Sequence, residues 1–356
     1  MNRGQRIGIG IAAALVLLAA CAFAAYEHWR APGGPAREDV LSWTPSETST
    51  EIFLDLNSLR HSPFLAELLR WAPQPAADPD YAQFVQATGF NYETDLNQVA
   101  ISTWKNGSDT FLFTVAEGRF DRKKISAFAQ TNGAKENRGR REVFSVPLAG
   151  TARRIAFTFL RDDLLALSST GNLDALLSEP HEADDAQAWH ERFRRLAGSP
   201  VFAVLRQDAA AGAALSSRAP GGLQSPQLSA LLDQLQWITI AGKPVGDNLR
   251  VVLEGEAVAD ATARQLSEAL NGLLVLAQAG LNDPKTRQQL QPEVRQAYLE
   301  LLKDADVTRI DRGETKSVRL ILDLTPQFLE AARNGTALVP TPPQNKASSG
   351  KRIVRN

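Results

Sequence analysis

The chain has 356 residues, of which 44% are hydrophobic and 22% are charged, and its formal net charge is −1. This length and composition are those of a globular protein with room for two domains. A net charge so close to zero provides no broad positive field, so we expect no nucleic-acid partner. The chain has one cysteine, which excludes an intrachain disulfide, so packing must stabilise the fold.

The N-terminus predicts delivery to a membrane. Residues 1–6 contain Arg3 and Arg6, and residues 7–26 follow without a charge. Twenty helical residues span about 30 Å, which is the thickness of the hydrocarbon core of a bilayer. We therefore expect a cytoplasmic segment at 1–6, a signal anchor at 7–26 in the inner membrane, a linker at 27–37, and a periplasmic remainder.

Two alternatives remain open for this segment. The motif Leu18-Ala19-Ala20-Cys21 resembles the lipobox of bacterial lipoproteins, which implies lipidation of Cys21, cleavage before it, and a lipid anchor. The motif Ala22-Phe23-Ala24 has the small-x-small pattern of an ordinary cleavage site, which would release a secreted protein. Tyr26 and Trp29 fit an interfacial aromatic belt and favour the uncleaved anchor.

The rest of the chain shows an internal repeat, with units at residues 38–180 and 195–335. In each unit an apolar strand pattern (residues 52–56 and 201–205) precedes a helix start, Ser62-Pro63 or Ser225-Pro226. A serine N-cap followed by proline at the first helical position is typical of such a start.

Each unit then has a predicted hairpin, residues 99–104 with 110–115 and residues 237–240 with 249–253, the second with a turn from Gly242 to Gly246. Both second strands end in Glu-Gly, and a helix opened by Asp121 or Asp260 follows. We predict an α+β fold of two tandem similar units, each a largely antiparallel sheet with helices packed on one face, behind the transmembrane helix. A parallel doubly wound sheet is the alternative, and the hairpins count against it.

The remaining segments are assigned by pattern. Short helices are predicted at residues 81–88 and 292–303, a solvated linker at 181–194, and a disordered basic tail at 336–356. Asp162-Asp163 is expected to form a turn between two strands. The basic residues of the first unit could form a strip on the exposed face of its sheet (Arg140, Arg141, Arg153, Arg154).

The sequence contains no recognisable catalytic, cofactor or metal motif. The densest polar cluster lies in the predicted linker and its preceding residues, but its two histidines are nine residues apart rather than i, i+4 (Glu179, His181, Glu182, Asp184, Asp185, His190, Glu191). Glu117 and Glu254 recur at equivalent places in the two units. They are the candidates for acid chemistry if the protein is an envelope hydrolase or transferase.

The overall layout resembles that of bacterial signal-anchored envelope proteins known as domains of unknown function, a resemblance that implies no functional residues. We expect a membrane-tethered extracytoplasmic binding or structural protein, without catalysis, that holds an envelope protein or polymer in the groove between its units. The alternatives are the hydrolase or transferase and a lipoprotein that assists envelope assembly or secretion.

Overall fold

Twelve antiparallel strands make up the sheet of this protein in a computed structural model that describes residues 39–63, 79–106, 109–147, 154–169, 174–177, 184–207 and 230–335. The strands are β1 (Thr50–Asp55), β2 (Leu96–Asn106), β3 (Asp109–Gly118), β4 (Ala134–Arg138), β5 (Arg141–Pro147), β6 (Arg154–Arg161), β7 (Leu164–Ser169), β8 (Val201–Arg206), β9 (Leu235–Val245), β10 (Asn248–Ala257), β11 (Asp306–Asp311) and β12 (Lys316–Leu324).

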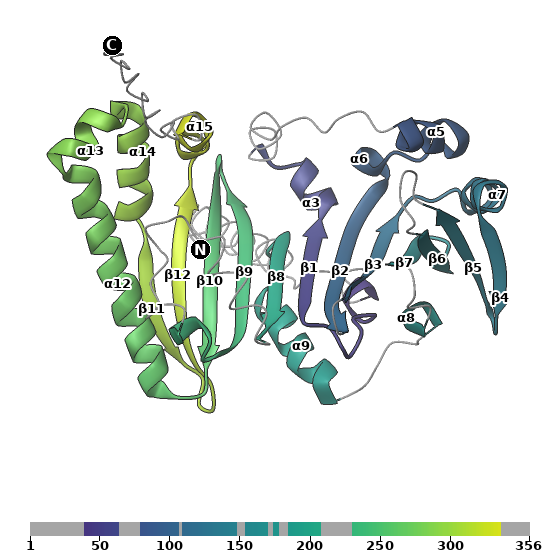
Figure 1. Ribbon diagram of the computed structural model, residues 1–356, viewed down its shortest axis with the longest axis horizontal. Coiled ribbons are helices and arrows are strands. Elements are labelled where there is room, and N and C mark those ends of the chain that lie inside the picture. The colour runs from purple at the N-terminus through teal and green to yellow at the C-terminus, as the bar shows by residue number, and fades with distance from the viewer. Residues whose placement is uncertain are drawn as a thin grey trace, which may run out of the picture.

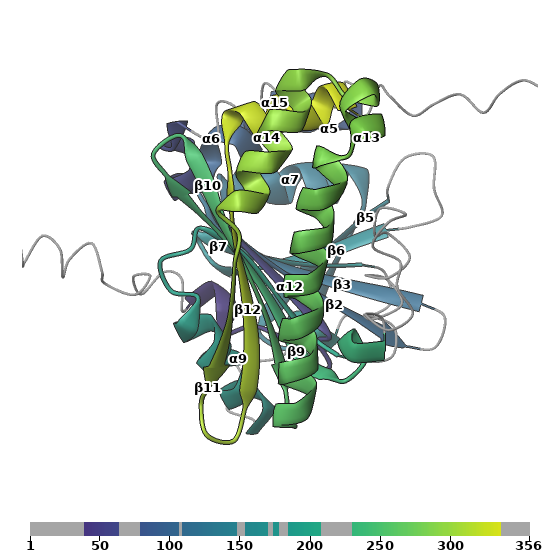
Figure 2. The same cartoon turned by 90° about the vertical axis from the view of Figure 1, so that its left-hand side faces the viewer.

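Ten helices are described, and they are interspersed among the strands along the chain. They are α3 (Leu56–Arg60), α5 (Pro79–Thr88), α6 (Tyr92–Asp95), α7 (Arg122–Asn132), α8 (Asp174–Leu177), α9 (Asp184–Arg195), α12 (Asp260–Asn282), α13 (Pro284–Gln289), α14 (Pro292–Lys303) and α15 (Pro326–Gly335). Figure 1 shows α12, α13 and α14 at one end of the sheet and α5 and α7 at the other. Figure 2 looks along the sheet and shows the strong twist between its two ends.

The sheet is continuous, in the order β11-β12-β10-β9-β8-β1-β2-β3-β7-β6-β5-β4. Both predicted hairpins are confirmed, as β2–β3 and β9–β10, and so is the turn at Asp162-Asp163 between β6 and β7. The prediction of an α+β fold with antiparallel strands is therefore confirmed. Strands β1 to β7 lie on one side of the β1–β8 pair and strands β8 to β12 on the other, and this pair is also antiparallel.

The strand register defines one face of the sheet by a row of paired residues that crosses from β5 to β12. All but one are apolar: Phe144, Phe157, Leu167, Thr114, Ile101, Ile52, Ala203, Ile240, Leu253 and Leu320. Helix α7 packs on this row through Ile125, and α12 packs on it through Leu266. These two helices therefore cover the same face, at opposite ends.

The opposite face is covered as well, so the prediction of helices on one face only is wrong. Trp237 and Ile238 are neighbours on β9 and point to opposite sides, because side chains alternate along a strand. Ile238 joins the core under α12, whereas Trp237 contacts Trp189 of α9, with 4.9 Å between ring centroids. Phe193 of α9 lies 5.8 Å from the ring of Phe202 on β8.

Helix α9 also corrects the expectation of a solvated linker at residues 181–194. Trp189 is 2% exposed and Arg192 is 6% exposed, so this helix is part of the core of the second face. The segment looks solvated in sequence because most of its residues are polar. The buried aromatic residues Trp189 and Phe193 lie four residues apart and form one face of the helix.

Two local predictions need smaller corrections. Strand β9 continues through Gly242 to Val245, and the turn is only Gly246-Asp247, with Gly246 at φ +60°. Residue Asp260 is the first helical residue of α12 rather than its N-cap; the N-cap is Ala259, which makes no side-chain hydrogen bond. Asp121 does cap α7, since its side chain accepts a hydrogen bond from Lys124 N.

Several predictions fall outside the described residues: the anchor at 7–26 with Cys21, the linker at 27–37, most of both Ser-Pro helices, and the tail at 336–356. Within the described ranges, none of the helices combines the length and apolar character needed to cross a bilayer.

Candidate functional site

Helices α5 and α7 form the roof of the candidate site. Asp121 fixes the start of α7, and Ile125 and Ala129, one turn apart, are buried against the sheet. Phe84 of α5 reaches the same core, and its ring meets that of Phe128 on α7 edge to face at 5.3 Å. The two helices thus contact each other through aromatic rings above the sheet.

A chain of phenyl rings in mutual contact runs from α5 to the sheet, ending at Phe159 on β6. Phe90 lies 5.9 Å from Phe84 and stacks on Phe120 at 5.4 Å, and Phe120 lies 6.2 Å from Phe159. Phe90 directly follows Gly89, whose φ of +74° turns the chain back after α5. Phe90 lies in the connection between α5 and α6, and Phe120 directly precedes Asp121, the N-cap of α7.

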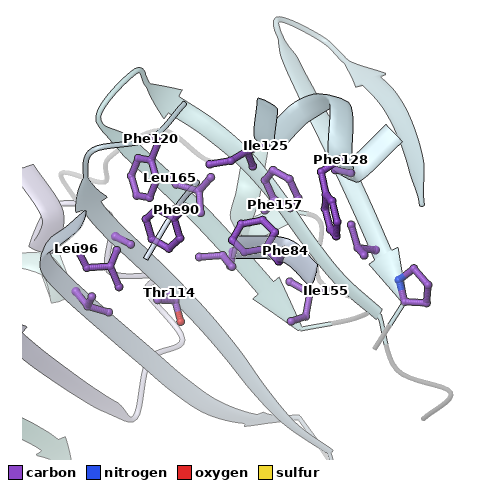
Figure 3. Close-up of a pocket in the computed structure, with 16 residues that line it drawn as sticks. Phe84, Phe90, Leu96, Thr114, Phe120, Ile125, Phe128, Ile155, Phe157 and Leu165 are labelled. Carbon is purple, nitrogen blue, oxygen red and sulfur yellow. The ribbon is translucent and has the colours of Figure 1, made fainter. Parts of the chain in front are cut away.

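Between roof and sheet lies an apolar pocket with a volume of about 340 Å³ (Figure 3). Its floor consists of side chains from five neighbouring strands: Val99, Ala116, Leu165, Phe157 and Val146. This volume lies at the lower end of the range for small-molecule pockets, about 300 to 1,000 Å³.

Among the residues that the structure describes, the lining of the pocket contains no charged side chain and one hydroxyl, that of Thr114 on β3. Thr114 is half-buried, whereas Ala116, two residues further along the same strand face, is buried. Backbone polar groups of the floor are used in the strand ladders. The described part of the lining is therefore suited to apolar matter, and it contains no acidic or basic side chain beside the Thr114 hydroxyl.

Glu117 is not part of this pocket, although it follows Ala116 directly. Alternation along β3 places its side chain on the other face, near Asp163 and Arg161. Burial raises the pKa of Glu117, and the nearby Asp163 charge raises it further, while Asn97 and Arg161 oppose the rise.

Glu254 has a different environment from Glu117. Burial favours its neutral form, but hydrogen bonds from Arg312 and Arg319 outweigh this and lower the pKa of Glu254. Arg319 donates to its Oε2 at 2.9 Å, and Arg195 lies 3.7 Å from Oε1. An ionised carboxylate held by arginines is a poor proton donor, and four strands separate β10 from β3, so the two glutamates form no joint site.

The other polar candidates do not assemble into a site either. His190 is exposed on α9, and the described residues contain no group of three or more His, Cys, Asp or Glu that could hold a metal ion. Arg153 of the predicted basic strip lies outside the described residues, so the strip stays a prediction. Arg141 donates to Leu176 O at 2.5 Å, and Arg154 donates to Ser145 Oγ at 2.9 Å.

Two buried polar sites were not predicted from the sequence: the ion pair of Arg192 with Glu256, and the carboxyl group of Glu51. Arg192 of α9 donates to Glu256 at 2.5 Å while its guanidinium lies 3.9 Å from the centroid of the Trp237 ring. Glu51 on β1 is fully buried and accepts a hydrogen bond from Ser102 Oγ at 2.5 Å. Burial raises the pKa of Glu51 to about 8, although hydrogen bonding to Ser102 opposes the rise. One feature of the sequence could have indicated the burial of Glu51: it lies two residues from Phe53 on the same strand, and therefore on the same face of the sheet.

Comparison with known proteins gives little further information. No family model matches the chain, and no curated protein matches it. Among solved structures, crystal forms I, III and IV of TP0453 are similar, at 7%, 9% and 10% sequence identity and TM-scores of 0.41, 0.43 and 0.43. The similarity covers 83%, 83% and 82% of this chain and 96%, 98% and 95% of theirs. A similarity of this degree implies nothing about ligand or activity.

Proposed function

We propose that this protein is a non-enzymatic binding protein of the bacterial envelope that takes an apolar small molecule into the pocket under α5 and α7. The observation that carries the proposal is a pocket of about 340 Å³ whose described lining residues are apolar apart from one hydroxyl. Apolar walls offer water few hydrogen-bond partners. Binding of an apolar ligand in place of this water is therefore favourable. The pocket replaces the groove between units as the proposed binding place.

The proposal includes two tandem units of unequal role. The succession of a strand, a hairpin and a helix supports the duplication, since β1, β2–β3 and α7 are followed by β8, β9–β10 and α12 in the same order. In the second unit, Ala263 and Leu266 of α12 are buried directly on Leu235 and Ile238. Leu235 in turn packs so closely on Gly255 that an added Cβ there would lie 2.7 Å from Leu235 Cδ1. We assign ligand binding to the first unit and structural support to the second.

Tethering to the membrane is also part of the proposal, and it rests on the sequence of residues 7–26. An apolar ligand has low solubility in water and is concentrated in bilayers. A binding protein held next to a bilayer, by a transmembrane helix or by lipidated Cys21, would take up such a ligand where it is abundant. Fatty-acid labelling of Cys21 in cells distinguishes the two anchors.

The experiment is a titration of the protein with the neutral fluorescent probe N-phenyl-1-naphthylamine, comparing two variants of β3. Thr114→Phe places a ring in the pocket. Leu112→Phe places the same ring on the same strand face two residues away, where Leu112 is 41% exposed and does not line the pocket.

We expect the probe to bind the wild type and Leu112→Phe equally, and to bind Thr114→Phe at least tenfold more weakly. Circular dichroism and the melting temperature establish that both variants are folded. Equal probe binding by both folded variants, or no binding by the wild type, would contradict the proposal.

A further inference from the structure

We infer that the ligand is a single-chain amphiphile, whose unbranched hydrocarbon chain lies in the pocket while its polar head group stays outside. The inference rests on the proposed function and specifies its ligand. Three features of the pocket carry it: its length across the sheet, the distribution of its polar atoms, and the nature of its walls.

The pocket is long compared with its volume. Its lining runs from Leu96 and Val99 on β2 to Val146 and Pro147 on β5, across β3, β7 and β6. Four strand spacings of about 4.8 Å make this roughly 19 Å. The volume of about 340 Å³ is therefore lined across five neighbouring strands. A compact ring system would fill two or three strand positions and leave the rest empty, whereas an extended chain contacts all five.

The polar atoms limit which ligands the pocket accepts. Among the described lining residues, the Thr114 hydroxyl alone can form a hydrogen bond with a ligand, so a polar group elsewhere along the ligand chain would lose its water without a partner there. A molecule with one polar end and an otherwise bare chain avoids that loss. Pro147, at the end of β5, is the one exposed residue among the described lining residues, so the pocket approaches solvent there.

The walls are suited to a flexible chain. Phe84, Phe128 and Phe157 border the middle of the pocket, and Ile125 and Ile155 border it from helix and strand (Figure 3). These side chains provide dispersion contacts in every direction and no directional recognition. Affinity should therefore depend on how many methylenes are buried, and only weakly on which head group is attached.

The test is displacement of N-phenyl-1-naphthylamine from the wild-type protein by saturated fatty acids of 8 to 18 carbons, each below its micelle concentration. Lysophosphatidylcholines of matched chain length test the head group, and cholesterol and pyrene test ring systems. Burial of one methylene contributes about 0.8 kcal/mol, so affinity should rise up to about fourfold per added carbon until the pocket is full. It should then level off.

The result expected is a chain-length series with a plateau, nearly equal constants for acids and lysolipids of equal length, and weak displacement by the ring compounds. Thr114→Phe should shift the plateau to shorter chains, and Leu112→Phe should leave it unchanged. Stronger displacement by cholesterol or pyrene, or no dependence on chain length, would overturn this inference while the proposed function stands. Failure of the probe to bind at all would instead refute the proposed function.

Discussion

The buried carboxyl group of Glu51 leads to a prediction about the pH dependence of stability. Glu51 is fully buried on β1, at the place where β1 pairs with β8 on one side and β2 on the other. Its ordinary pKa of 4.5 is raised to about 8 by burial. Glu51→Gln keeps the shape and the polar contact with Ser102 but removes the charge.

The magnitude follows from proton linkage. Between pH 4.5 and about 8 the folded state keeps the proton of Glu51 and the unfolded state has lost it. Stability therefore falls as pH rises through this window, because the folded state binds more protons. The full difference corresponds to roughly 5 kcal/mol, of which about 3 kcal/mol should appear between pH 5 and pH 8.

The assay is urea denaturation of wild type and Glu51→Gln from pH 5 to pH 8. The free energy of unfolding of the variant minus that of the wild type should rise with pH by about 3 kcal/mol. Glu47→Gln, an exposed glutamate four residues earlier, is the control and should show no such trend. A pH-independent difference between wild type and Glu51→Gln would refute the reasoning.

Three further predictions concern stability measured by urea denaturation. Arg192→Met should cost about 3 kcal/mol, because it leaves the buried charge of Glu256 with only one arginine, and Arg192→Met with Glu256→Met should recover part of that loss. Gly118→Ala should destabilise by about 1 to 3 kcal/mol, since its Cβ would lie 2.5 Å from a backbone oxygen, whereas Gly272→Ala, with open space around it in α12, should stabilise by about 1 kcal/mol. Ala259→Asp should add an N-cap to α12 and gain about 1 kcal/mol; no gain would contradict the assigned cap.

Much of the fold was predictable because local rules decided it. Strand alternation and turn residues identified both hairpins, and the N-cap at Asp121 and proline at the start of α14 placed helices correctly. The position of α9 was not predictable in this way, because its burial depends on Trp237 and Glu256, which are distant in sequence. A polar-looking segment became core through contacts that only the folded sheet provides.

The pocket could not be found from sequence, because its residues look like ordinary core. Phe84, Phe90 and Phe120 occupy loop-flanking or helical positions, and no pattern shows that their rings border empty space rather than one another. The sequence drew attention to Glu117, which is one residue from the pocket but on the other side of the strand. Because side chains alternate along a strand, Glu117 and its neighbour Ala116 point to opposite faces of the sheet. Once the strand register is known, this alternation places Glu117 outside the pocket.

Photo-crosslinking with a diazirine-bearing palmitic acid, followed by peptide mapping, is the most direct measurement of where this protein binds its ligand. We expect labelled peptides from α5, α7 and strands β2, β3 and β6; the labelling should be lost when unmodified palmitic acid competes and reduced in Thr114→Phe. Labelling confined to α12 or to the face covered by α9, or labelling that unmodified palmitic acid leaves unchanged, would contradict it.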